Sequence, residues 1–275
     1  KSQFVLFIFL FIFLLGRAQP FLGVDQKVVL PFEYINNFVI VSIVLENKLP
    51  LKFILDTGAQ HILITKKELA EILKLEYKKE FRLVGADMER ELIAHLVTGV
   101  SLQIGGKETE NLQMLVLDED YFLFEQITGM NIQGILGGSF LKRFVVEIDY
   151  RRKKLTLHPP SFFKANKKYI PIPFSRHKNK PYIKSNISLP NSTVMTNADL
   201  LVDSGAGVAL LLDINSDEKI TIPELAIPGN IGAGLGGSLI GHKGMLPKMN
   251  IGPFVLKNIP TSFQHIENDS LAAEL

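Results

Sequence analysis

Two aspartates in this chain occur in the same local setting. Asp56 lies in the stretch FILDTGAQ, residues 53–60, and Asp203 lies in LLVDSGAG, residues 200–207. In each stretch an apolar run precedes the aspartate, and a hydroxyl residue and a glycine follow it directly. A carboxylate at the end of a rigid, partly dry strand is suited to acid–base chemistry, because such a setting perturbs its pKa. The two stretches therefore predict a catalytic pair if the fold brings them together.

The chemistry of such a pair follows from its charge. Two carboxylates at close range cannot both ionise at low cost, so the pair retains one proton and titrates in two separate steps. The ionised member can take a proton from water while the protonated member donates one to a substrate carbonyl, which hydrolyses an acyl group without a covalent intermediate. Gly58 and Gly205 permit a tight turn, and the hydroxyls of Thr57 and Ser204 are short enough to bond across an interface.

The similarity extends well beyond the two aspartates. A shift of 147 residues, the separation of Asp56 and Asp203, also places VGA at 84–86 on IGA at 231–233. Upstream the register slips by a few residues, which hairpin loops tolerate. A repeat of this length indicates two copies of one structural unit.

The repeat sets the expected domain organisation. One lobe spans about residues 24–158 and the other about 169–275, with the boundary after Pro159 and Pro160. Two equivalent lobes can face each other across a pseudo-twofold axis, as a pseudo-dimer within one chain. That arrangement would place the two aspartates side by side.

Most of the chain has the pattern of β-structure. Runs rich in Val, Ile, Leu and Phe, such as FVIVSIVL at 38–45, alternate with Gly, Pro and Asn. One helix is expected at about 66–74, where Thr65 and Glu68 match a capping box. We therefore expect an all-β fold with few short helices.

Composition excludes several classes of function. The 275 residues are 47% hydrophobic, enough for a substantial core, and 30 basic residues balance 28 acidic ones with no basic block that would follow a phosphate backbone. Nucleic acid is therefore not an expected partner. The absence of cysteine excludes disulfides and thiolate metal sites, and the histidines lack metal-ligand spacing, so we expect no metal and no cofactor. The glycine pattern at 232–237 satisfies a dinucleotide motif but lies outside any βαβ unit.

The first 18 residues have the pattern of a signal peptide. Lys1 supplies a positive start, Phe4 to Leu15 form an apolar run, and Gly16 and Ala18 precede a possible cleavage site. The run is shorter than the ~20 apolar residues that span a bilayer. We expect a secreted or periplasmic protein without a stable membrane anchor after cleavage.

With these motifs in view, the chain resembles the retropepsin/pepsin-like aspartic peptidases. The resemblance rests on LDTGA and VDSGA, on GILGG at 134–138 and on the repeated lobe. The segment GILGGSFLKRFVVEIDYRRKKLTL, residues 134–157, is similar to that of secreted bacterial members with two lobes in one chain. The resemblance implies a bilobal, double-ψ β-barrel-like fold.

The resemblance also implies roles for individual residues. Asp56 and Asp203 would be the catalytic dyad of an endopeptidase acting on a peptide or protein substrate, and residues 135–137 would pass beneath the first catalytic loop. The family closes a β-hairpin flap over its substrate. The matching flap residues here are Gly85, Ala86, Asp87, Gly232, Ala233 and Gly234.

Two alternatives bear on these expectations. The same fold could serve a catalytically inactive secreted peptide-binding protein, because fold alone does not fix function. In addition, the shift of 147 places the second copy of the 134–138 segment beyond Leu275. We therefore expect the second lobe to be truncated before its closing strands, less stable than the first, and weakly active or inactive as it stands.

Overall fold

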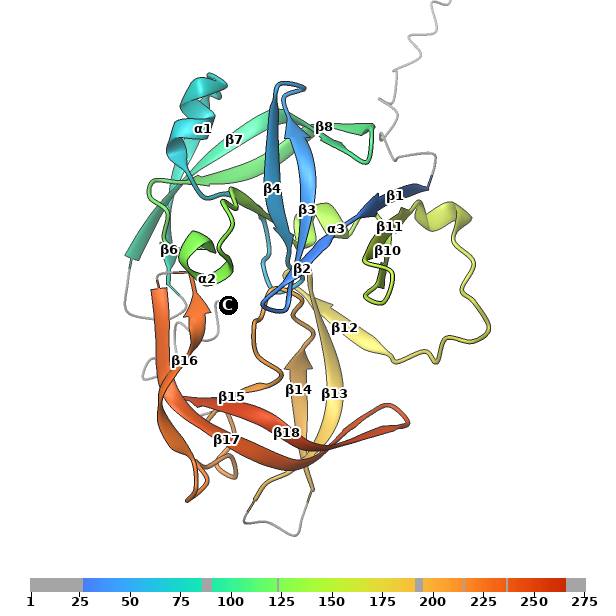
Figure 1. The fold of residues 1–275 in the computed structure, drawn as a ribbon, viewed down its shortest axis with the longest axis vertical. Coiled ribbons are helices and arrows are strands. Elements are labelled where there is room, and N and C mark those ends of the chain that lie inside the picture. Colours follow the sequence, from blue (N-terminus) through green and yellow to red (C-terminus); the bar gives the residue numbers. More distant parts are fainter. Residues whose placement is uncertain are drawn as a thin grey trace, which may run out of the picture.

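The computed structural model describes residues 27–85, 91–122, 124–190, 195–214, 216–235 and 237–265. Within these ranges the chain is built almost entirely of strands, arranged in two lobes that lie one above the other in Figure 1. The expected all-β, bilobal fold is confirmed. The signal-peptide prediction falls on residues outside the described ranges.

The first lobe is built on an eight-stranded sheet in the order β2-β3-β4-β9-β5-β8-β7-β6. β3 also pairs with β7, so the six strands from β3 to β7 in this order close on themselves. The strands are β2 (Glu33–Ile35), β3 (Phe38–Leu45), β4 (Leu49–Leu55), β5 (Ile62–Ile64), β6 (Tyr77–Val84), β7 (Glu91–Ile104), β8 (Lys107–Leu117) and β9 (Gly134–Leu136).

The second lobe repeats these pairings. β13 pairs with β14 and β17 as β3 pairs with β4 and β7, and β15 runs parallel to β18 as β5 runs parallel to β8. Among the described residues β9 has no counterpart in this lobe. The strands are β12 (Phe174–His177), β13 (Lys180–Ser188), β14 (Met195–Leu201), β15 (Leu211–Asp213), β16 (Ile227–Gly234), β17 (Gly237–Ile251) and β18 (Phe254–Gln264).

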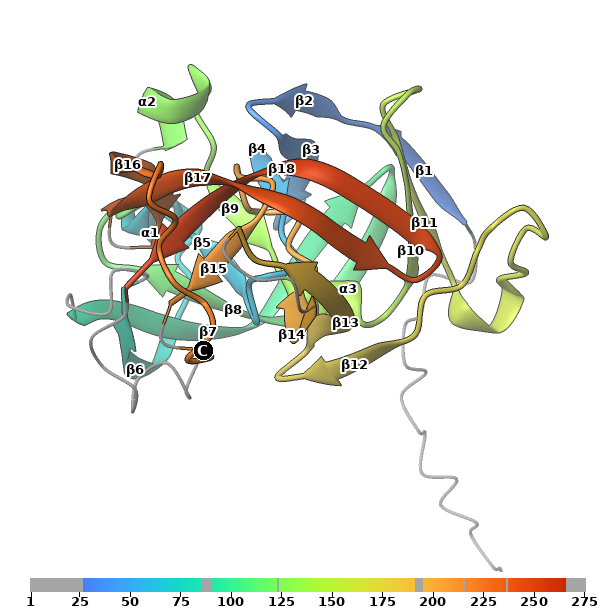
Figure 2. The same ribbon diagram turned by 90° about the horizontal axis from the view of Figure 1, so that it is seen from below.

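A small third sheet lies at one side of the molecule, next to the segment that leads into the second lobe (Figures 1 and 2). Its order is β1-β11-β10. No helix in the described ranges is long and apolar enough to cross a membrane. These remaining elements are β1 (Val28–Pro31), β10 (Val145–Asp149), β11 (Lys154–His158), α1 (Lys67–Ile72), α2 (Phe124–Thr128), α3 (Gly138–Leu141) and the 3₁₀ turn η1 (Pro160–Phe162).

The central strands of the first lobe are apolar on both faces because each face covers its own core. In β3, Val39, Val41 and Ile43 face one buried cluster, whereas Phe38 and Ile40 face the other. Successive side chains of a strand point to opposite faces, so consecutive apolar residues are required where both faces are covered, as at 38–41. The central strands of this lobe, including the one that ends before Asp56, are therefore packed on both faces.

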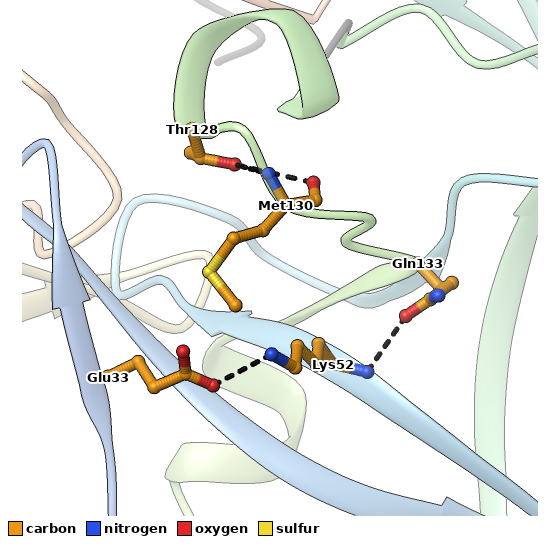
Figure 3. Close-up of polar contacts among 5 residues, drawn as sticks. All are labelled: Glu33, Lys52, Thr128, Met130 and Gln133. Carbon is orange, nitrogen blue, oxygen red and sulfur yellow. Dashed lines mark hydrogen bonds and ion pairs between the residues drawn. The ribbon is translucent and has the colours of Figure 1, made fainter.

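The strand β9 is fixed to β4 by the residues that precede it (Figure 3). The Gln133 N–H donates to the Lys52 carbonyl at 2.9 Å, and the Lys52 N–H donates to Gln133 Oε1 at 2.8 Å. Lys52 Nζ also pairs with Glu33 at 2.8 Å, and the Met130 N–H donates to the Thr128 hydroxyl at 3.1 Å. The two bonds between Gln133 and Lys52 hold the chain beside β4, and β9 continues from there in parallel register with β4.

The helix expected at about 66–74 is present but shorter, and its predicted capping box is wrong. The N-cap of α1 is Lys66, which makes no side-chain capping bond. The Thr65 N–H instead donates to the Gln133 carbonyl at 3.0 Å, so Thr65 extends β5 beside the chain entering β9. Its hydroxyl is buried without a hydrogen-bond partner among the described residues.

We expect Leu136→Ala to lower the free energy of unfolding by ~2–5 kcal/mol, because Leu136 is fully buried in β9 and its truncation leaves a cavity. Urea titration followed by circular dichroism measures the loss. The control is Leu225→Ala, at a residue that is 92% exposed, where the change should stay within ~0.5 kcal/mol. Equal effects of the two variants would contradict the central position of β9.

Candidate active site

Each of the two aspartates lies just beyond the end of a strand, and the repeat aligns these two strands. Asp56 comes immediately after β4, and its N–H donates to the Leu136 carbonyl of β9 at 3.1 Å. Asp203 comes after β14, where the Val202 N–H donates to the Pro181 carbonyl at 2.9 Å. Asp56 is half-buried, whereas Asp203 is exposed. The two carboxylates therefore sit in related but unequal surroundings.

The structure brings both aspartates and both glycines together. A Cβ atom on Gly58 would overlap the Asp203 carboxylate, and one on Gly205 would overlap the Asp56 carboxylate. Neither glycine has a positive φ, so close approach of the opposite lobe, and not a left-handed turn, requires glycine here. Gly58 and Gly205 were expected to permit a tight turn, but in the structure they leave space for the carboxylate of the opposite loop.

The hydroxyls of Thr57 and Ser204 connect the two loops in a reciprocal pattern. The Thr57 hydroxyl donates to the Val202 carbonyl at 2.6 Å and accepts from the Ser204 N–H at 2.9 Å. The Ser204 hydroxyl donates to the Leu55 carbonyl at 2.8 Å and accepts from the Thr57 N–H at 3.2 Å. Each hydroxyl thus satisfies a donor and an acceptor of the other lobe's backbone, as the sequence predicted for short side chains at this position.

The environment of Asp56 favours its protonated form. Burial, the negative charge of Asp203 and a hydrogen bond with Asp203 raise the pKa of Asp56 to about 7. The N–H groups of Gly58 and Ala59 donate to Asp56 Oδ1 at 2.7 and 3.0 Å, which opposes the shift without cancelling it. Asp203 Oδ1 accepts the Gly205 N–H at 2.7 Å. At neutral pH the pair can therefore hold a proton.

A cavity of about 490 Å³ opens beside the two carboxylates and is lined by both lobes. Apart from the aspartates and Asn36, its lining side chains are apolar, which suits a site that excludes water from a reaction. The lining side chains from the first lobe include Phe38, Ile54, Leu63, Phe122, Phe124, Ile127 and Ile135, and those from the second include Val208, Leu211, Ile231, Leu235 and Leu239.

The predicted flap residues have different outcomes in the two lobes. Gly232, Ala233 and Gly234 line the cavity, at the end of β16 where the β16–β17 hairpin turns. Gly85 follows β6 and does not line this cavity. Ala86 and Asp87 lie outside the described residues.

Several residues of the site were not found by sequence reasoning. Phe122 and Phe124 stack at a centroid distance of 4.7 Å in the cavity wall, and no spacing rule relates them to the aspartates. Asn37 donates from Nδ2 to the Gly207 carbonyl at 3.0 Å, across the lobes. The Asn-Asn pair at 36–37 indicates a hairpin turn, and both residues have positive φ, but this pattern does not reveal the partner of the turn.

A basic side chain also lies near the dyad. Lys180 begins β13 and is buried, and burial together with Lys178 lowers its pKa, while Asp203 and Asp56 oppose this shift. In the first lobe the equivalent position, directly after the β2–β3 turn, is the apolar Phe38. The two sides of the site therefore differ in charge.

Comparisons with known proteins found a family match for part of the chain and a match to a solved structure. Residues 40–140 match the family described as Aspartyl protease, a segment that includes Asp56, β5 and β9. No curated protein sequence matches the chain significantly. Among solved structures, a retropepsin-like aspartic protease from Rickettsia conorii is 28% identical over 48% of this chain and 89% of that one, with a TM-score of 0.34. The family match is thus confined to a segment of the first lobe, the one that contains Asp56.

Proposed function

We propose that the protein is an aspartic endopeptidase in which Asp56 and Asp203 act as the catalytic dyad. The observation that carries the proposal is the mutual packing of each carboxylate against the glycine of the opposite loop. Holding two carboxylates close together costs free energy, because like charges repel, and a protein that only binds peptides gains nothing from it. The proposed location, supported only by the signal-like pattern of residues 1–18, is the periplasm or the exterior.

The proposed mechanism assigns the two aspartates different roles. Asp56 holds the shared proton, because its surroundings raise its pKa to about 7, and donates it to the carbonyl oxygen of the substrate. Asp203 takes a proton from a water molecule, whose oxygen bonds to the carbonyl carbon. The tetrahedral intermediate then loses its C–N bond as a proton moves from the dyad to the departing amine.

The substrate in this proposal is a peptide in extended form. The cavity beside the dyad is apolar and is bounded by the β16–β17 hairpin of the second lobe. Strands at a binding site offer backbone groups that pair with an extended chain, and the pockets between them accept its side chains. Peptide and protein segments that present apolar side chains are therefore the expected partners.

The alternative, an inactive peptide-binding protein on the same fold, has two observations in its favour. Asp203 is exposed, and no strand equivalent to β9 supports its loop among the described residues. A misplacement of ~1 Å at a catalytic group can cost ~10²-fold in rate. Turnover by the purified protein separates the two functions.

We expect Asp56→Asn and Asp203→Asn each to reduce kcat/KM for a denatured protein substrate by at least ~10²–10⁴-fold, because each removes one partner of the proton transfer. Circular dichroism and thermal melting should show an intact fold. The matched control is Asp199→Asn, at an exposed residue paired with Lys184, which should retain full activity. Full activity in either dyad variant would refute the mechanism.

The pH dependence of activity follows from the raised pKa of Asp56. We expect kcat/KM to fall as pH rises above about 7, because the shared proton is then lost. A pH–rate profile on a peptide substrate measures this limb. A profile that keeps rising through the alkaline range would contradict the assignment of Asp56 as the proton donor.

The same group gives stability a pH dependence of defined sign. The folded-state pKa of Asp56 lies above its unfolded value of roughly 4, so its contribution is full below pH ~4 and is lost as pH rises to about 7. Urea unfolding at a series of pH values should show this decline, and Asp56→Asn should remove it. An identical pH slope in the variant would contradict the raised pKa.

A further inference from the structure

We infer that Lys180 is a positioning residue of the proposed dyad, and that its positive charge favours the state in which one carboxylate is ionised while the other keeps the proton. The effect of Lys180 on turnover rests on the proposed function, whereas its effect on how the two carboxyls titrate does not. Lys180 is the first residue of β13 and is only 8% exposed. A charged group taken out of water costs free energy unless opposite charge or hydrogen bonds compensate it. The surroundings of Lys180 therefore decide what its charge does.

The strand pairing beside the second catalytic loop sets Lys180 opposite Asp203. β13 pairs antiparallel with β14, and the bond from the Val202 N–H to the Pro181 carbonyl continues this register past the end of β14. One pair further along, the register joins Lys180 and Asp203. Residues directly opposite each other on antiparallel strands point to the same face and have Cβ atoms ~5 Å apart. The Lys180 side chain and the Asp203 carboxylate therefore start from neighbouring positions on one face.

The first lobe has the same relation between strand register and aspartate. Ile40 of β3 is opposite Ile54 of β4, and the same count sets Phe38 opposite Asp56. Phe38 and Asp56 both line the cavity beside the dyad, so the relation extends to the side chains. Phe38 is 7% exposed, which shows that this strand position can be filled without a charge. Lys180 therefore adds a charge to one side of the site that the packing of the strand does not require.

The turn that precedes Lys180 is held against the first lobe, where the two lobes meet (Figure 1). Lys178 and Asn179 have φ values of 46° and 65°, close to those of residues 36–37 in the first lobe, and form the same kind of two-residue hairpin turn. A Cβ atom on Gly138, at the start of α3, would overlap the Asn179 carbonyl. Because Lys180 directly follows this turn, its backbone is positioned by contacts with both lobes.

The titratable groups around Lys180 come from both lobes. They include Asp56, Asp203, His61, Lys142 and Lys178. Burial and Lys178 lower the pKa of Lys180, whereas Asp203 and Asp56 favour its charged form. Burial, then Lys142 and Lys180, lower the pKa of His61, so the charge of Lys180 also reaches the loop of Asp56. Coulomb interactions are mutual, so a charge that the dyad stabilises on Lys180 also stabilises an ionised carboxylate of the dyad.

A positive charge at this point acts on both titration steps of a dyad that shares one proton. It lowers the pH at which the first carboxyl ionises, and it lowers the pH at which the remaining proton is lost. Removal of the charge should move both steps to higher pH. Over part of the acid range the variant dyad would then carry two protons and lack a base, while on the alkaline side it would keep its proton donor to a higher pH.

The test compares the pH–rate profiles of variants at Lys180. Lys180→Met removes the charge but keeps an unbranched side chain, and Lys180→Gln removes the charge but keeps a polar one. In both variants we expect the acid and the alkaline limb of kcat/KM to move to higher pH by about one unit. Lys180→Arg retains the charge and should keep both limbs where the wild-type protein has them. Limbs that stay in place in Lys180→Met and Lys180→Gln, with activity lowered equally at every pH, would assign the residue to packing alone and overturn the inference.

The matched control is Lys184→Met on the same strand. The Lys184 side chain is 91% exposed and pairs with Asp199 at 3.3 Å, so solvent screens its charge. Both limbs should stay where they are in this variant. A shift of the limbs in Lys184→Met or in Lys180→Arg as large as that in Lys180→Met would show that the site responds to any change in β13, and would overturn the inference.

Carbon-13 NMR of the aspartate carboxyl groups provides a readout that does not need turnover, with the two signals assigned through Asp56→Asn and Asp203→Asn. We expect the titration of the dyad to move to higher pH by about one unit in Lys180→Met. If it moves while the wild-type protein shows no turnover, the inference about the charge stands and the proposed peptidase function fails. If turnover is present and the limbs stay in place, the peptidase function stands and the inference fails. Movement of both supports both, and the absence of turnover and of movement refutes both.

Discussion

The reciprocal bonding of two short loops is the constraint on which the rest of the structure depends. Thr57 and Ser204 each bond to the backbone of the opposite lobe, and this exchange leaves no room for a Cβ where Gly58 and Gly205 meet the carboxylates. Each of these bonds pairs a donor of one loop with an acceptor of the other, so together they fix the register in which the two loops meet. In the first lobe the strand before the loop, β4, is held between two buried clusters, which fixes the position of that loop.

The two lobes meet this constraint with unequal support. Around Asp56 the backbone is fixed by β4 and β9, and the carboxyl is buried enough to hold a proton. Around Asp203 the carboxylate is exposed, and the strand that would sit beside β14 is absent from the described residues. Unequal surroundings divide the roles of acid and base between chemically identical groups.

The parts of the site that sequence revealed are those that are short-range and repeated. In each Asp-hydroxyl-Gly triplet the residues of the proposed dyad and its supporting groups are adjacent in sequence. The two triplets are related by the same shift of 147 residues that aligns the rest of the repeat. The positions of Phe122 and Phe124 in the cavity wall could not be predicted from the sequence, because they depend on tertiary packing. The capping box predicted at Thr65 was wrong for a related reason. The sequence has the pattern of a cap, but the Thr65 N–H bonds to the Gln133 carbonyl, so Thr65 continues the strand instead. Local rules fail where a distant segment competes for the same group.

The reciprocal bonds have a consequence for how the molecule could have arisen. Every bond that Thr57 and Ser204 make across the lobes ends on main-chain atoms or on the other hydroxyl, so the contact depends little on the identity of surrounding side chains. An interface in which each side offers the same groups is isologous, and one such loop is complementary to its own copy. The two loops can then differ in their surroundings, as in the half-buried Asp56 and the exposed Asp203, without losing the junction that joins them.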